Sequence, residues 1–403
     1  MPLIYLIAGE QSGDVLGARL MRAILRRSPD AVFAGTGGAA MEALGLTSLF
    51  PMSDLALMGL LEVLPKLRML RARLAQTTAD IAARKPDVVV TIDSPGFTLR
   101  VLRAIRPLGI PRVHYVAPQV WAWRENRVKK FPGLWEKLLC LLPFEATFFA
   151  RHGLPAQFIG HPILEIGCGN GDAARFRARH GIDPDARILI VMPGSRRTEV
   201  RRLLPILEAT LARLPEKMIP VIPLAGPVAD FVTFHARAWK TLPVLIAGEQ
   251  DKFDAFAAAS AALTKSGTSS LELALAGVPM VVTYRLNPIT HAIVKQMATV
   301  KYASLLNLLA GREIVPELLQ YQGTPAKLAA ALGRILTPEG AAEQRAAFAA
   351  PLALLRAPPD VPGEPSGVHG GEPSSLNTGE PSDAAAAAVL SLLKQPAALH
   401  PAA

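Results

Sequence analysis

Short apolar runs alternate along this chain with longer segments whose apolar residues recur at helical spacing. In the first half, residues 16–25 predict a helix, and strands are predicted over residues 3–8, 88–92, 112–116 and 138–142. These runs are apolar on consecutive positions, which is typical of parallel strands covered on both faces by helices. The pattern therefore predicts an α/β fold.

The pattern stops at a Gly-rich stretch over residues 166–172 and then starts again. The second half predicts helices over residues 203–214 and 269–276, and strands over residues 188–192, 221–222, 262–264 and 280–283. We therefore predict one α/β domain over residues 1–166, a hinge over 167–186, a second α/β domain over 187–345 and a tail over 346–403. Two such domains place the expected site in the cleft between them.

The tail has its own composition. The sequence Gly-Glu-Pro-Ser occurs at residues 363–366, 371–374 and 379–382. Such a segment buries too little apolar surface to offset the entropy of ordering, so residues 357–382 are expected to form a flexible linker. Residues 384–393 are expected to form a short helix.

Composition narrows the classes of protein. The chain has 403 residues, of which 50% are hydrophobic and 19% are charged, which excludes disorder for most of it. We expect no bilayer-spanning segment and no signal peptide, and two cysteines exclude a disulfide framework, so a cytoplasmic location is expected. The net charge of +10 suits nucleic acid, an anionic membrane or phosphorylated substrates, and equally a solvated basic surface.

Two candidate loops follow strands of the first half. The loop after residue 8 contains Gly9, Glu10, Ser12, Gly13 and Asp14, where glycines allow a ligand to approach the backbone. Ser12 or Asp14 could equally cap the following helix. Asp93 ends the strand over residues 88–92, where burial would raise its pKa and suit it to act as a general base. The alternative is an ordinary Asx turn before Ser-Pro-Gly.

Two further loops follow strands of the second half. Arg196 follows Pro-Gly-Ser, where backbone N–H groups and a guanidinium suit a phosphate; a solvated surface turn is the alternative. The loop Ser266, Gly267 and Thr268 opens a helix whose dipole attracts a diphosphate, and Glu272 in that helix could hold ribose hydroxyls. Capping by Ser266 or Thr268 is the alternative there.

The sequence predicts no metal site, but it contains two segments suited to contact with apolar groups. No metal site is expected, because no histidines have ligand spacing and Asp183-Pro184-Asp185 reads as a turn. Two segments mix apolar and basic residues and suit an acyl chain or a membrane, or else simple packing. Pro65 is expected to break or kink a helix in the first segment. The candidate contact residues are Met58, Leu61, Leu64, Leu67, Arg68, Arg71, Trp121, Trp123 and Arg124.

Taken together, the motifs resemble the lipid-A-disaccharide synthase family. The resemblance rests on residues 8–14, 57–64, 115–124 (Tyr-Val-Ala-Pro-Gln-Val-Trp-Ala-Trp-Arg), 142–145, 193–196, 266–268 and 307–311, in that order. It implies a GT-B glycosyltransferase of two Rossmann-like domains facing a cleft. It also implies an inverting reaction that joins UDP-2,3-diacylglucosamine to 2,3-diacylglucosamine 1-phosphate, giving a β-1,6-linked tetraacyl disaccharide 1-phosphate and UDP in lipid A biosynthesis.

The resemblance assigns roles to four residues. Asp93 falls on the family's general base, Arg196 on an arginine near the diphosphate, Glu272 on the acid at the nucleoside and Asn307 on an active-site asparagine. It implies no metal and no cofactor, an anionic inner-membrane surface as a partner, no nucleic acid, and leaves a homodimer open. Gly96 and Leu306 depart from the family pattern, where Asp and Pro are usual.

Three alternatives stay open at this point. One is another enzyme of the same fold, such as a UDP-sugar epimerase or a transferase for soluble acceptors. The second is a basic nucleic-acid-binding protein. Two observations argue against it: the arginines are scattered along the sequence, and no recognised nucleic-acid-binding module is present. The third is an inactive nucleotide-binding scaffold.

Overall fold

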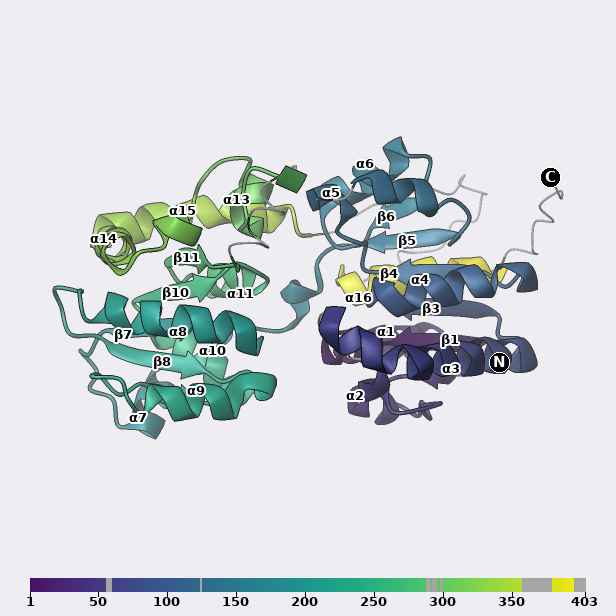
Figure 1. The fold of residues 1–403 in the computed structure, drawn as a ribbon, viewed down its shortest axis with the longest axis horizontal. Coiled ribbons are helices and arrows are strands. Elements are labelled where there is room, and N and C mark those ends of the chain that lie inside the picture. The colour runs from purple at the N-terminus through teal and green to yellow at the C-terminus, as the bar shows by residue number, and fades with distance from the viewer. Residues whose placement is uncertain are drawn as a thin grey trace, which may run out of the picture. The chain divides into compact units, whose positions relative to one another are not determined.

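The computed structural model describes residues 1–55, 60–123, 125–287, 291, 296–297, 300–356 and 379–394, without the side chains of 60–66 and 394. The chain forms two compact units (Figure 1). Unit 1 comprises Met1–Pro162 and Leu355–Ala403, and unit 2 comprises Ile163–Leu354.

Unit 1 is built on a six-stranded parallel sheet with the order β2-β1-β3-β4-β5-β6. In register, Ile4 of β1 lies opposite Val88 of β3, and Val89 of β3 lies opposite Arg112 of β4. The strands are β1 (Leu3–Ala8), β2 (Val32–Thr36), β3 (Val88–Ile92), β4 (Arg112–Tyr115), β5 (Lys137–Cys140) and β6 (Ala156–Phe158). The α-helices are α1 (Gln11–Arg27), α2 (Ala39–Glu42), α3 (Leu60–Arg84), α4 (Pro95–Ala104), α5 (Val120–Trp123), α6 (Pro143–Arg151) and α16 (Pro381–Leu390).

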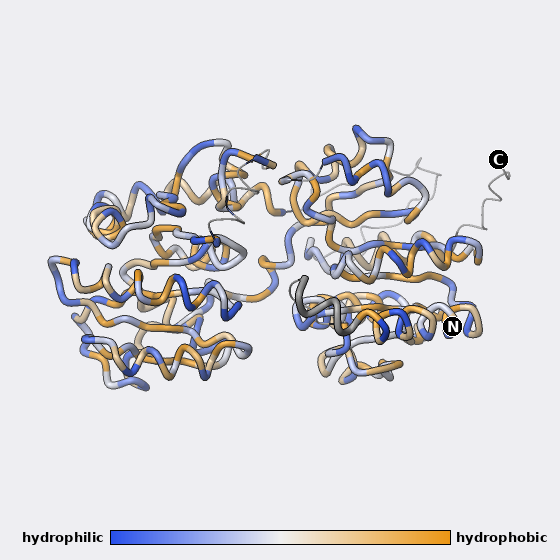
Figure 2. The backbone as a smooth tube through the Cα atoms, in the orientation of Figure 1, coloured by the Kyte–Doolittle hydropathy of each residue, from blue (hydrophilic) through white to orange (hydrophobic). Residues whose placement is uncertain are grey.

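Helices cover both faces of this sheet, as the continuous apolar runs predict. One face packs against α1 and α16, and the other packs against α3 and α4. The strands carry mostly hydrophobic residues, whereas the helices alternate hydrophobic and hydrophilic positions (Figure 2). Burial of β1 and β3 fixes where each strand ends, and therefore where the loops after them emerge.

The C-terminal helix α16 returns to unit 1, where Figure 1 shows it in yellow. Ala385, Ala386 and Val389 are fully buried in the same core as α1. The carboxylate of Asp383 accepts a hydrogen bond from Arg26 of α1 at 2.9 Å. The helix expected over residues 384–393 thus belongs to the core of unit 1, and it begins at Pro381, within the segment 357–382 expected to be a flexible linker. Residues 357–378 of that segment lie outside the described residues.

The break expected at Pro65 does not occur. A single helix, α3, runs from Leu60 to Arg84 through this proline. Its later turns are anchored on the sheet, since Ile81 is fully buried in a core that Leu70 and Leu74 also contact. Tertiary packing of the long C-terminal part therefore outweighs the local cost of one proline.

Unit 2 also contains a six-stranded parallel sheet, with the order β12-β11-β10-β7-β8-β9. The strands are β7 (Ile188–Met192), β8 (Ile219–Pro223), β9 (Val244–Ile246), β10 (Ala261–Lys265), β11 (Met280–Tyr284) and β12 (Glu317–Leu319). The α-helices are α7 (Ala173–His180), α8 (Arg197–Leu211), α9 (Ala229–Ala236), α10 (Glu249–Ala258), α11 (Ser269–Leu275), α13 (Leu305–Ala310), α14 (Pro325–Ile335) and α15 (Pro338–Ala353).

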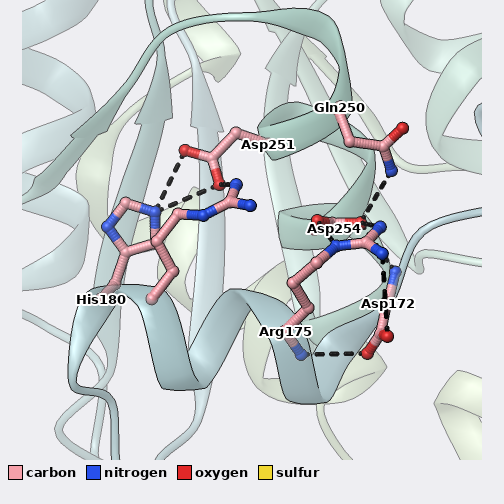
Figure 3. A network of polar contacts seen from close by, with 7 residues as sticks. Asp172, Arg175, His180, Gln250, Asp251 and Asp254 are labelled. Carbon is pink, nitrogen blue, oxygen red and sulfur yellow. Dashed lines mark hydrogen bonds and ion pairs between the residues drawn. The ribbon is translucent and has the colours of Figure 1, made fainter.

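The segment expected to be a hinge, residues 167–186, contains helix α7 and belongs to unit 2. Figure 3 shows the polar network that joins α7 to α10. The buried carboxylate of Asp254 accepts hydrogen bonds from Arg175 Nε and Nη2, each at 2.6 Å, and Asp251 accepts from His180 at 3.0 Å. The units therefore divide near Pro162, and α15 carries unit 2 to Leu354, beyond the expected limit at residue 345.

Within the described part of the chain, no helix combines the length and apolarity needed to cross a membrane.

Candidate functional site

A strained turn follows β3 at the carboxyl edge of the unit 1 sheet. Asp93 and Ser94 both have left-handed backbone conformations, with φ values of 48° and 47°. The backbone N–H of Asp93 donates to the carbonyl of Tyr115 at 2.8 Å, and the hydroxyl of Thr98 donates to the carbonyl of Asp93 at 2.7 Å. A non-glycine residue in this region costs about 1–3 kcal/mol and persists where surrounding contacts impose it, which is typical of functional sites.

The electrostatic setting of Asp93 suits a proton acceptor. Burial raises the pKa of this carboxyl, and a hydrogen bond from the backbone of Ser94 opposes part of that rise. A raised pKa makes an ionised carboxylate a stronger base than an exposed aspartate. The ordinary Asx turn weighed for this residue does not require two consecutive left-handed residues.

The loop after β1 lies directly against this turn. A Cβ atom on Gly9 would stand only 2.5 Å from the Ser94 hydroxyl oxygen, so glycine is required for the two loops to meet. Glu10 occupies the N-cap position of α1, and Ser12 is exposed in the first turn. Gly13 is less constrained, because a Cβ there would make ordinary contacts of 3.5 Å or more.

Asp14 lies in the same segment but has a structural task. Its buried carboxylate accepts hydrogen bonds from the backbone N–H groups of Gly38, Ala40 and Met41 at 2.8, 3.0 and 3.1 Å. It therefore caps α2, and its place in an active-site loop stays a prediction. Neither Asp14 nor Ser12 caps α1 with its side chain.

The next strand along the chain, β4, also ends in a constrained turn. Val116 after β4 has a φ of 78°, a rare conformation for a β-branched residue. The chain then enters α5, where the indole of Trp121 donates to Glu145 Oε1 at 3.0 Å and packs edge-on against Phe144. Trp123 is exposed. Trp121 is thus anchored in unit 1 through its indole N–H and its ring.

Glu145 is a residue that sequence analysis did not assign. Its Oε2 accepts from the N–H groups of Leu141 and Leu142 at 3.1 and 3.0 Å, so it closes the N-terminus of α6. Burial raises the pKa of Glu145 to about 7. The spacing Leu-Pro-Phe-Glu, with proline opening a helix and glutamate two residues later, was the available signal.

The remaining contact candidates of unit 1 are only partly described. Met58 and Arg124 lie outside the described residues, as do the side chains of Leu61 and Leu64. Leu67 is half-buried on α3, whereas Arg68 and Arg71 are exposed.

In unit 2, the loops after β7 and β10 meet around one carboxylate, that of Glu199. Arg196 Nη1 lies 3.6 Å from Glu199 Oε1, and Lys265 Nζ lies 3.4 Å from Glu199 Oε2. The Tyr284 hydroxyl donates to Glu199 Oε1 at 3.0 Å, and burial together with the negative charge of Glu199 raises the pKa of Tyr284 to about 12. We call Arg196, Glu199, Lys265 and Tyr284 the Glu199 cluster.

The predicted loop of Ser266, Gly267 and Thr268 begins directly after Lys265. The Ser266 hydroxyl donates to the carbonyl of Ala303 at 2.6 Å, and Thr268 stands at the N-cap of α11 without a side-chain capping bond. Gly267 has a φ of 151°, which favours glycine. Capping by Ser266 or Thr268, weighed above, therefore does not explain this loop.

Glu272 lies one turn into α11 and pairs with a lysine. Lys252 Nζ lies 3.2 Å from both carboxylate oxygens of Glu272. Both side chains remain partly exposed. Glu272 can therefore still accept a hydrogen bond from a ligand, in a position set by α10.

Asn307, which is predicted to contact the donor, is buried among protein partners. Its side chain is fully buried and makes four hydrogen bonds within the protein. Oδ1 accepts from the N–H groups of Ile314 and Val315, and Nδ2 donates to the Val315 carbonyl and to Glu317. Glu317 in turn accepts from the backbone of Ala303 and Ser304. Asn307 thus positions the loop that Ser266 also contacts, and its contact with the donor stays a prediction.

Each unit therefore assembles its own group of candidate residues. In unit 1, Gly9 lies against Ser94, the neighbour of Asp93. In unit 2, Arg196 and Lys265 approach the same carboxylate, that of Glu199. Among the described residues, no cluster of three or more His, Cys, Asp or Glu side chains could hold a metal ion. The carboxylate of Asp183 accepts from the backbone N–H of Asp185 at 2.8 Å, as expected of a turn.

Solved structures share this architecture. A UDP-GlcNAc 2-epimerase from Neisseria meningitidis bound to UDP-GlcNAc superposes with a TM-score of 0.59 and 14% identity, covering 88% of this chain and 96% of that chain. The calicheamicin glycosyltransferase CalG4 gives a TM-score of 0.57 and 16% identity over 98% of each chain. The chain has two α/β units, each built on a parallel sheet. This is the fold of a GT-B glycosyltransferase, which confirms the predicted fold class.

Sequence comparison then defines the family. A model of the family described as lipid-A-disaccharide synthetase matches residues 4–349. The lipid-A-disaccharide synthase of Granulibacter bethesdensis is 57% identical over 367 residues, covering 89% of this chain and 93% of the relative. That of Gluconobacter oxydans is 53% identical over 399 residues, covering 98% and 91%. The chain belongs to the lipid-A-disaccharide synthase family and is an enzyme of the disaccharide-forming step in lipid A synthesis.

Proposed function

We propose that the chain transfers 2,3-diacylglucosamine from its UDP derivative to the 6-hydroxyl of 2,3-diacylglucosamine 1-phosphate. The products are the β-1,6-linked tetraacyl disaccharide 1-phosphate and UDP. Inversion at the anomeric carbon follows from a single in-line attack, in which a base removes the hydroxyl proton as the C–O bond forms and UDP leaves.

The placement of Asp93 is the observation that carries this proposal. It ends a central strand of unit 1 in a strained turn against Gly9, and its pKa is raised by burial. We assign it the proton of the acceptor hydroxyl. Thr98 acts only as a positioning residue, because its hydroxyl bonds the Asp93 carbonyl rather than the carboxylate.

We assign the donor to unit 2. The guanidinium of Arg196 is exposed and follows the Gly194 turn, which suits a phosphate oxygen of UDP. Glu272 is assigned to the ribose hydroxyls, held by Lys252. With cations and backbone N–H groups to stabilise the UDP leaving group, the proposed reaction requires neither a metal nor another cofactor.

The acceptor and the membrane are assigned to the apolar and basic segments of unit 1. The exposed indole of Trp123 and the exposed guanidinium groups of Arg68 and Arg71 support this assignment. Aromatic and cationic side chains together suit acyl chains next to anionic headgroups. We propose peripheral attachment to the inner face of the cytoplasmic membrane, and a homodimer is compatible with it.

The test is a reconstituted reaction with the purified full chain. UDP-2,3-diacylglucosamine and the 1-phosphate acceptor are incubated with EDTA, and UDP release and disaccharide are both followed by mass spectrometry. The proposal predicts both products in equal amounts in the presence of chelator. UDP release without disaccharide would contradict the proposed acceptor, and activity only with added divalent metal would contradict the metal-free reaction.

A matched acceptor separates the proposal from a transferase for soluble sugars. Glucosamine 1-phosphate carries the same hydroxyl and phosphate but no acyl chains. We predict turnover with the diacylated acceptor alone. Equal rates with both acceptors would contradict the role given to the apolar segments of unit 1.

A further inference from the structure

We propose that Lys265 binds the diphosphate of the donor as a second cation beside Arg196, in a position set by Glu199. This inference rests on the proposed function, because it names a further residue for the nucleotide of the same donor. The Lys265 side chain extends from the carboxyl end of β10, at the start of the predicted Ser266–Thr268 loop.

Two glycine turns enclose the Lys265 side chain. A Cβ on Gly194 would stand 3.3 Å from Lys265 Cδ, and a Cβ on Gly267 would stand 3.4 Å from Cε and 3.7 Å from Nζ. Both glycines have positive φ values, 116° and 151°. The aliphatic part of Lys265 therefore passes between the two loops predicted to bind phosphate, and its ammonium group lies next to Gly267.

Two contacts hold the ammonium group there, one with the Glu199 carboxylate and one with the ring of Tyr284. Glu199 Oε2 lies 3.4 Å away and is buried without a hydrogen-bond donor among the described residues. The ring of Tyr284 lies 5.6 Å from Nζ, and the Tyr284 hydroxyl keeps the other oxygen of Glu199 in place. Lys265 is thus oriented by a fixed carboxylate and an aromatic face, although one-fifth of its side chain remains exposed.

The charges of the Glu199 cluster are unbalanced. Arg196 and Lys265 approach the two oxygens of one carboxylate, and the Tyr284 hydroxyl adds no charge because it is neutral at physiological pH. Two cations against one anion leave one positive charge between two glycine turns. A diphosphate supplies the missing negative charge and has enough oxygens to reach both cations.

The test compares Lys265→Met with a matched control, Lys217→Met, in the full chain. Lys217 is an exposed lysine just before β8, at the opposite, amino edge of the same sheet, so the control removes the same charge. Calorimetry then measures the binding of UDP, uridine and inorganic pyrophosphate. Lys265→Arg serves as the conservative variant.

We expect Lys265→Met to lower the binding affinity for UDP and for pyrophosphate about 10- to 100-fold, which is the usual loss for one hydrogen bond to a charged group. Uridine binding should be unchanged, Lys265→Arg should recover most of the UDP affinity, and Lys217→Met should resemble the wild type. A merely structural lysine would weaken uridine and UDP alike, and that result would overturn the inference.

The outcomes also separate this inference from the proposed function. Suppose that the wild type binds pyrophosphate, that this binding depends on Lys265, and that UDP binds no more tightly than pyrophosphate. The anion site is then supported, and the assignment of UDP as the donor is wrong. If the wild type binds UDP and Lys265→Met binds it equally well, the donor stands and the role of Lys265 is wrong. Binding of neither ligand by the wild type would overturn both.

Discussion

Replacing Asn307 with leucine tests whether this residue positions a loop or contacts a ligand. The substitution conserves volume but removes four hydrogen bonds from a fully buried site. It leaves the N–H groups of Ile314 and Val315 and the Val315 carbonyl without their partner. An unsatisfied buried polar group costs about 1–3 kcal/mol, so we expect a local loss of roughly 3–5 kcal/mol.

Amide hydrogen exchange over residues 303–319 measures this loss directly. A decrease of that size in local opening free energy accelerates exchange by roughly 100- to 4000-fold. Asn170→Leu, at an exposed position of unit 2, should leave the same peptides unchanged. If Asn307→Leu exchanged at the wild-type rate and nevertheless lost UDP binding, its amide would be a ligand group and the geometric reasoning would be refuted.

Three other perturbations have defined outcomes. Gly171→Ala should lower the melting temperature, because a Cβ would stand 1.9 Å from the carbonyl oxygen of Phe253. An overpacked site costs about 1–3 kcal/mol, and an unchanged melting temperature would contradict this contact. The Arg175 guanidinium holds the pKa of Asp254 well below its usual range. This pair therefore stabilises the folded protein fully at pH values above the ordinary aspartate pKa, and the stabilisation is lost as the pH falls below that value. Asp254→Asn should therefore cost about 1–2 kcal/mol in urea unfolding at pH 7 and less below pH 4, and a constant difference would refute the linkage. Truncation after Arg356 should destabilise unit 1 by roughly 3–5 kcal/mol by removing buried α16, whereas truncation after Lys394 should not; equal stability of the two would contradict the role of α16.

The parallel sheets were predictable because their strands are buried on both faces. Such strands appear in the sequence as continuous apolar runs, and β1, β3 and β7 were each predicted from such a run. In an α/β fold the loops after these strands carry the chemistry. Asp93 and Arg196 could therefore be selected from their places after β3 and β7.

Residues that act through distant partners could not be found in this way. Glu199, Lys265 and Tyr284 lie on three different elements, and only the strand order of the sheet brings them together. Similarly, the return of α16 to unit 1 depends on apolar complementarity with α1, which no local pattern records. Asn307 was selected because of the family resemblance. A resemblance can assign a residue to the active site, but it does not show which groups the side chain contacts.

The central claim is that Asp93 accepts the proton of the acceptor hydroxyl, and the rate of disaccharide formation by Asp93→Asn tests it most directly. Loss of a general base should reduce the rate about 100- to 10,000-fold, with donor binding intact and the fold preserved. Asp30→Asn, an exposed aspartate of unit 1, should retain the wild-type rate. The wild-type rate should also fall at acid with an apparent pKa above that of an ordinary aspartate, because burial raises the pKa of Asp93. A folded Asp93→Asn enzyme within a few-fold of the wild-type rate would contradict the account.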